Sequence, residues 1–93
     1  MSKENDVARV IVDAAYHVHV AMGPGLLESV YEAALAHELT KRGCAVKRQA
    51  PVSVMYDGIT FEEGFRADLI VNDCVIVELK SVENISLRLC AFA

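Results

Sequence analysis

The chain has 93 residues and a formal net charge of −4, with 54% hydrophobic and 24% charged residues. This size and composition predict one small folded domain and exclude a disordered chain. The sequence shows no run of about 18 to 20 apolar residues and no basic-then-apolar leader, so we expect no membrane span, no signal peptide and a cytoplasmic location.

Clustered basic residues and cysteines narrow the classes of function. Four of the nine basic residues lie around Gly43: Lys41, Arg42, Lys47 and Arg48. They predict either a local basic rim or cations favoured at the carboxyl end of a helix, while the acidic net charge gives no general attraction to nucleic acid.

The three cysteines are Cys44, Cys74 and Cys90. Their odd number and wide spacing predict reduced thiols rather than a zinc or redox site.

Two helices are predicted in the first half of the chain. Residues 6–22 repeat apolar side chains every three or four positions, with Asp6 as N-cap and Gly23 as the end. Pro24 predicts the first turn of a second helix that continues to Gly43, its C-cap. The expected apolar face of this helix consists of Leu27, Val30, Ala34 and Leu35. Glu28 is expected at the seam between core and solvent, close to Tyr31.

An antiparallel meander is predicted from Cys44 onward, where the apolar period changes to two. Asp57-Gly58 is a strong signal for a two-residue hairpin turn, and Pro51 indicates an edge strand or a bulge. Strands at 65–71 and 75–80 complete the meander. The predicted fold class is therefore α+β, two helices followed by a β-meander, in a single domain over residues 1–93.

The register of the last hairpin determines which charged residues meet. A two-residue turn at 72–73 mixes charged and apolar side chains on both faces, whereas a three-residue loop at 72–74 produces one wholly apolar face. The latter register pairs Val71 with Val75, Leu69 with Val77, and Ala67 with Leu79. On the other face it sets Ile70 against Ile76, Asp68 against Glu78, and Arg66 against Lys80. The sorting of apolar side chains favours the three-residue loop.

Two interpretations of the charged face are open, because two carboxylates opposite each other destabilise a sheet unless a cation compensates them. One is a solvated charge ladder in which Asp68 pairs with Lys80 and Arg66 pairs with Glu78. The other is a Mg²⁺ ion, which prefers oxygen ligands and binds through one or two carboxylates plus a substrate phosphate. In that case Lys80 lies on the same face, where its ammonium can act on water or on phosphate charge.

A carboxylate on one strand followed by Glu-x-Lys on the next resembles the motif of the PD-(D/E)xK nuclease superfamily. Residues 25–31 (GLLESVY) also fit G-x-x-E-x-x-Y, the signature of the GxxExxY family of that superfamily. Residues 48–51, 64–68 (GFRAD) and 77–83 (VELKSVE) are similar to the family in order and spacing. The resemblance runs from about Val10 to Ser86.

The resemblance implies a restriction-endonuclease-like core and a metal-dependent nuclease that hydrolyses phosphodiester bonds in DNA or RNA. The implied catalytic residues are Glu28, Asp68, Glu78 and Lys80, with Mg²⁺ or Mn²⁺ bound by Asp68, Glu78 and Glu28, and with Tyr31, Gln49 and Arg66 in supporting positions. The alternative function is a non-catalytic module that binds nucleic acid or a protein.

The carboxyl-terminal end departs from the family pattern. Members continue into a further helix and a final apolar strand, whereas Ile85-Ser86 is followed here by LRLCAFA. This resembles a truncated or frameshifted version that lacks the last helix and strand. We therefore expect an inactive or weakened site, exposed apolar residues such as Leu87, Leu89 and Phe92, and self-association through an exposed sheet edge.

Overall fold

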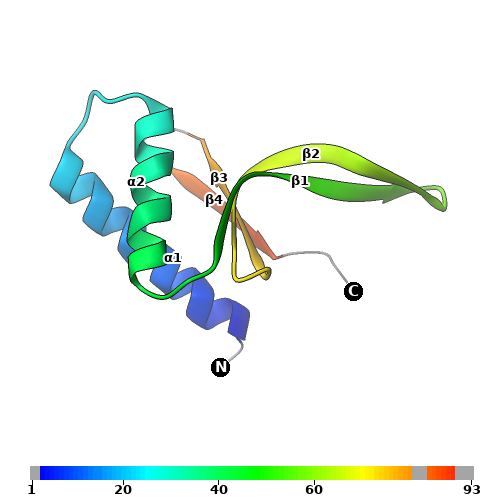
Figure 1. Cartoon of the computed structure of the whole chain (residues 1–93), viewed down its shortest axis with the longest axis horizontal. Coiled ribbons are helices and arrows are strands. Elements are labelled where there is room, and N and C mark those ends of the chain that lie inside the picture. Colours follow the sequence, from blue (N-terminus) through cyan, green and yellow to red (C-terminus); the bar gives the residue numbers. More distant parts are fainter. Residues whose placement is uncertain (1–2, 81–83, 90–93) are drawn as a thin grey trace.

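Two helices pack against a four-stranded antiparallel sheet in the computed structural model, which describes residues 3–80 and 84–89 (Figure 1). The elements in chain order are α1 (Lys3–Met22), α2 (Glu28–Lys41), β1 (Val46–Tyr56), β2 (Ile59–Val71), β3 (Val75–Leu79) and β4 (Ile85–Leu89). The strands lie side by side in the order β1-β2-β3-β4. This arrangement confirms the predicted α+β class. Within the described residues, neither helix has the length and apolarity that a membrane crossing requires.

The first helix ends where the sequence predicts but begins earlier. Gly23 follows its last residue with a φ of 72°, a left-handed conformation that glycine adopts without strain. The helix already includes Lys3, so Asp6 lies in the first turn and is not the N-cap. Its carboxylate and that of Glu4 stabilise this turn because they face the positive end of the helix dipole.

The second helix begins at Glu28, so the prediction that Pro24 opens it is wrong. The flanking residues Gly23 and Gly25 both have positive φ values, which keeps the segment around Pro24 out of helical geometry. The buried residues of α2 are Tyr31, Glu32, Leu35, Ala36, Glu38 and Leu39. Leu35 therefore belongs to the core as predicted. Leu27 precedes the helix and is 72% exposed, and Val30 is 38% exposed, so these two were misplaced.

The first hairpin forms a long ribbon that extends away from the helices (Figure 1). Tyr56 pairs with Ile59 across the predicted turn, and Asp57 and Gly58 both have positive φ values, as a turn of this type requires. Pro51 lies on edge strand β1, as its missing N–H predicts. The register shifts between Val52 and Val54, so the ribbon is irregular near its middle.

The last hairpin adopts the predicted three-residue loop, because Val71 pairs with Val75, Ile70 with Ile76, and Leu69 with Val77. Its apolar face packs against both helices in the main core, which contains Val7, Ile11, Ala14, Leu35, Ala36, Leu39, Leu69, Val71, Val75 and Val77. The ladder within the described residues runs no further than Leu69 and Val77. The predicted pairings of Ala67 with Leu79, of Asp68 with Glu78 and of Arg66 with Lys80 are therefore not part of it.

The strand β4 changes the expectation for the end of the chain. It pairs antiparallel with the whole of β3, from Leu79 opposite Ile85 to Val75 opposite Leu89, so the β3 edge is not free. Leu87 is half-buried and packs against the main core, which makes the prediction of an exposed Leu87 wrong. Alternation along β4 turns this side chain toward the core. Phe92 and the side chain of Leu89 lie outside the described part of the chain.

Candidate functional site

Asp68 and Glu78 lie on neighbouring strands, one residue beyond Leu69 and Val77, the last pair of the β2–β3 ladder. Strand alternation places Asp68 with Ile70 and Glu78 with Ile76, on the side opposite Leu69 and Val77. Both carboxylates are half-buried. Asp68 Oδ2 accepts a hydrogen bond of 2.7 Å from the backbone N–H of Leu79. This bond attaches the Asp68 side chain to β3, one residue from Glu78.

Gln49 links Asp68 on β2 to another carboxylate, that of Glu32 on α2. Its Nε2 is 3.4 Å from Asp68 Oδ1 and donates a 2.7 Å hydrogen bond to Glu32 Oε1. Gln49 has a φ of 50°, a left-handed conformation that non-glycine residues adopt rarely and that is found disproportionately at functional sites. The sequence predicts a supporting position for Gln49, and in the structure its side chain contacts Asp68.

Glu32 is the residue of this network that sequence reasoning missed. It is 6% exposed, and the Arg48 guanidinium compensates its charge at 3.2 Å. A buried carboxylate needs such partners because transfer of an unpaired charge out of water is costly. Its position one helical turn after Glu28 was a signal in the sequence. However, only the placement of β1 beside α2 reveals which of the two carboxylates faces the sheet.

Glu28 and Tyr31 occupy different environments from those expected of site residues. Glu28 is exposed as the first residue of α2, where the helix dipole favours its charge. Among residues 3–80 and 84–89, no three Asp, Glu, His or Cys side chains converge so that they could hold a metal ion. A three-carboxylate cluster of Glu28, Asp68 and Glu78 is therefore not assembled here. Tyr31 is buried, and its hydroxyl donates to the Gly23 carbonyl, which ties α2 to the loop before it.

Glu78 carries two cationic neighbours. Lys80 Nζ lies 3.9 Å from Glu78 Oε2, and the Arg88 guanidinium contacts Glu78 Oε1 directly. Arg66 is exposed, and no ion pair in the described part of the chain joins it to Glu78 or joins Lys80 to Asp68. The diagonal charge ladder is therefore wrong. Lys80 instead pairs with Glu78, two residues before it in the chain.

The basic residues around Gly43 do not form a free rim, since each has an acidic partner. Arg42 pairs with Asp13 at 2.6 Å and with Glu38 at 2.8 Å, and Lys41 also contacts Glu38. Lys47 pairs with Asp73 at 2.9 Å, in addition to the pair between Arg48 and Glu32. Hydrogen bonding to Arg42 lowers the pKa of Glu38, and hydrogen bonding to Asp13 and Glu38 raises the pKa of Arg42. The positive charges of this region are consequently neutralised by ion pairs within the fold.

The cysteines do not supply a metal or redox site within the described residues. Cys44 and Cys74 are both free thiols. Burial raises the pKa of the Cys74 thiol, which keeps it protonated and poorly nucleophilic at neutral pH. Cys90 lies outside the described part.

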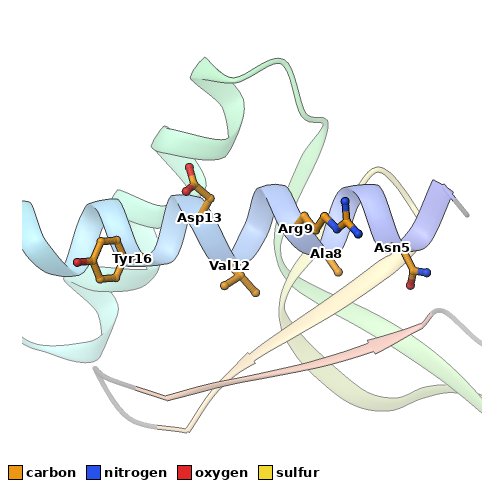
Figure 2. A pocket seen from close by; sticks show the side chains of 6 residues that line it. All are labelled: Asn5, Ala8, Arg9, Val12, Asp13 and Tyr16. Atoms are coloured by element: carbon orange, nitrogen blue, oxygen red, sulfur yellow. The ribbon is translucent and has the colours of Figure 1, made fainter. Parts of the chain in front are cut away.

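A hollow of about 660 Å³ lies elsewhere, on the surface of α1 (Figure 2). Its lining consists of Asn5, Ala8, Arg9, Val12, Asp13 and Tyr16, all from this one helix. None of the site residues predicted from the sequence lines it. The hollow and the strand carboxylates are therefore separate features of the surface.

A family model described as the PD-(D/E)XK nuclease superfamily matches residues 5–90. No curated protein and no solved structure gives a significant match. The match covers nearly the whole chain, and the two helices followed by an antiparallel sheet agree with a restriction-endonuclease-like fold. The chain belongs to the PD-(D/E)XK nuclease superfamily.

Proposed function

We propose that the chain is a metal-dependent nuclease that hydrolyses phosphodiester bonds of nucleic acid, with Asp68 and Glu78 as ligands of Mg²⁺ or Mn²⁺. The observation that carries the proposal is the hairpin register, in which Asp68 and Glu78 directly follow the Leu69–Val77 pair on neighbouring strands, with Lys80 beside Glu78. Membership of a nuclease superfamily supports the reaction class.

The donor set fits a hard divalent cation. Carboxylate oxygens are the protein ligands that Mg²⁺ takes, usually one or two per site. Asp68 Oδ2 is engaged by the Leu79 N–H, whereas the contact of Oδ1 among the described residues is the 3.4 Å one with Gln49, at the outer limit of a hydrogen bond. This oxygen is available as a ligand. The ion, when bound, supplies a Lewis acid and lowers the pKa of a bound water.

The remaining residues act around the two ligands. The Leu79 N–H and Gln49 orient the Asp68 carboxylate. Lys80 is exposed, so its ammonium can reach an incoming phosphate and stabilise the negative charge that develops there. Arg66 is likewise exposed and suited to a phosphate contact. Glu28 has no assigned role beside these ligands, because it does not cluster with them in the described part of the chain, and Tyr31 fixes the loop before α2.

A non-catalytic binding module is the second candidate. It is favoured by one observation, namely that Glu78 already has two cationic partners in the folded chain. A carboxylate neutralised in this way can be a structural group without any metal. The two candidates differ in whether the chain cleaves nucleic acid, and the binding module does not require divalent ions at Asp68 and Glu78.

The test measures Mn²⁺ binding and cleavage of a mixed DNA and RNA panel by four proteins: the parent, Asp68→Asn, Lys80→Met and Lys47→Met. We expect Asp68→Asn to lose both binding and cleavage. Lys80→Met should retain the ion but lower the cleavage rate by about 10² or more, the scale for loss of a preorganised electrostatic group. Lys47→Met is the matched control, because Lys47 forms its ion pair with Asp73 and not with Asp68 or Glu78.

Cleavage that survives in Asp68→Asn would refute the assignment of the site. Metal binding without cleavage by any of the four proteins would favour the binding module. Absence of Mn²⁺ binding by the parent would remove the metal-dependent reaction from consideration.

A further inference from the structure

Through its guanidinium, Arg88 contacts two side chains, those of Glu78 and Phe65. Its guanidinium contacts Glu78 Oε1, and its Cζ lies over the Phe65 ring, 4.8 Å from the ring centroid. Stacking of a guanidinium on an aromatic face adds attraction and fixes the plane of the group. Arg88 thus joins β4 to a residue of β2 across the intervening β3.

The pairing of β4 determines this position. Glu78 lies opposite Ser86, and Ile76 lies opposite Arg88. Arg88 is therefore diagonal to Glu78 and shares its side of the sheet, because alternate residues of a strand point the same way. Long side chains reach diagonal neighbours across a sheet, so the contact follows from the register.

The charges of the site balance without a metal. Asp68 and Glu78 contribute two negative charges, and Lys80 and Arg88 contribute two positive charges, while Glu32 is compensated separately by Arg48. A divalent cation added to this set lies next to a guanidinium and competes with it for the Glu78 carboxylate. Ion binding must therefore either break the Arg88 contact or tolerate the repulsion.

We propose that Arg88 is an internal competitor that sets the metal affinity of the site, and this rests on the proposed role of Asp68 and Glu78 as ligands. In the metal-free chain Arg88 neutralises Glu78. Metal binding displaces the guanidinium from the carboxylate, and Phe65 retains it nearby. The residue thereby determines the divalent-ion concentration at which the site fills.

Arg88 is better suited to this role than Lys80. Lys80 Nζ is 3.9 Å from Glu78, at the limit of an ion pair, and its side chain is 63% exposed. The Arg88 side chain is 53% exposed and has the additional contact with Phe65. An anchored guanidinium loses less conformational freedom when it binds a carboxylate than a free ammonium does.

The test is titration of Mn²⁺ alone into the full chain, with free ion measured by electron paramagnetic resonance. Arg88→Met keeps an unbranched side chain that can pack on Phe65 and removes the charge. A dication and a guanidinium about 5 Å apart in water repel by an energy equivalent to roughly tenfold in affinity. We expect Arg88→Met to bind Mn²⁺ roughly tenfold more tightly than the parent, Arg88→Lys to fall between the two because lysine keeps the charge but loses the guanidinium stacking, and Lys47→Met to be unchanged.

The outcomes separate this inference from the proposed function. Equal or weaker Mn²⁺ binding by Arg88→Met overturns the inference; if Asp68→Asn still abolishes binding, the metal site itself stands. Absence of binding by both the parent and Arg88→Met overturns both proposals. Tighter binding that is lost again in the double variant Arg88→Met, Glu78→Gln supports the competition for Glu78. Arg88→Gln provides the same comparison if circular dichroism shows that the Met variant is unfolded.

Discussion

Removal of the Glu32 carboxylate is the perturbation that tests the network around Asp68 most directly. In Glu32→Ala, Gln49 loses the acceptor 2.7 Å from its Nε2, and Arg48 loses its ion-pair partner. Hydrogen bonds to charged groups contribute about 1.5 to 3 kcal/mol, so the Gln49 bond is the larger loss. The Arg48 pair is worth about 0 to 1 kcal/mol, because the Arg48 side chain is 48% exposed and water screens the interaction.

These contributions give an expected destabilisation of about 2 kcal/mol, since relief of the buried charge offsets part of the loss. For a domain of this size, that corresponds to a fall in Tm of about 8 to 16 °C. Glu32→Gln is the matched variant, because its amide oxygen can still accept from Gln49. It should cost about half as much as Glu32→Ala.

The assay is urea unfolding followed by circular dichroism at 222 nm, for the parent, both Glu32 variants, Gln49→Ala and the double variant Glu32→Ala, Gln49→Ala. A double-mutant cycle isolates the coupling between the two side chains, which we expect to be about 1 kcal/mol. A Glu32→Ala protein within about 0.5 kcal/mol of the parent, the range of ordinary surface substitutions, would refute the reasoning. Zero coupling would show that Gln49 is held in place by its backbone alone.

Three further outcomes follow from the fold. Leu39→Ala should destabilise the chain by about 2 to 5 kcal/mol, because Leu39 is 0% exposed in the main core, and an unchanged urea midpoint would contradict this packing. Tyr31→Phe should cost about 1 kcal/mol and speed hydrogen exchange of amides in 23–27, since it removes the bond to the Gly23 carbonyl; parental exchange rates would disprove that role. The Arg42 guanidinium lowers the pKa of Glu38, so the stabilisation from this pair is complete above about pH 4.3 and is lost as the pH falls through the folded-state pKa. Urea midpoints should therefore fall more steeply with acid in the parent than in Glu38→Gln. Identical pH profiles of the two proteins would argue against this contribution of the pair.

The register of the last hairpin was predictable from the sequence because apolar sorting admits few solutions. A strand has a period of two, and a slip of one residue would carry Leu69 and Val71 out of the core. The turn at Asp57-Gly58 was equally local, since positive φ values restrict the residues that fit it. The positions of Asp68 and Glu78 on neighbouring strands, next to the Leu69–Val77 pair, follow from the same rule.

The start of α2 was not predictable in the same way. Proline suits a first helical turn, but the positive φ values of the glycines on both sides of Pro24 were not visible in the sequence. The displacement of the helix start by several residues left Leu27 outside the helix. It also left Glu28 at the exposed first position, away from any three-carboxylate cluster in the described chain.

The sequence by itself thus determined the class of fold, the hairpin registers and the pair of strand carboxylates, because these depend on short-range periodicity and turn chemistry. Only the tertiary structure decided which charges are compensated and by which partner. Glu32 meets Gln49 and Arg48 because α2 packs beside β1, and Arg88 reaches Glu78 because β4 pairs with β3. These pairings are long-range contacts between side chains of many rotamers, so neither spacing nor hydropathy specifies them. Burial and strand order select the partners after the backbone has assembled.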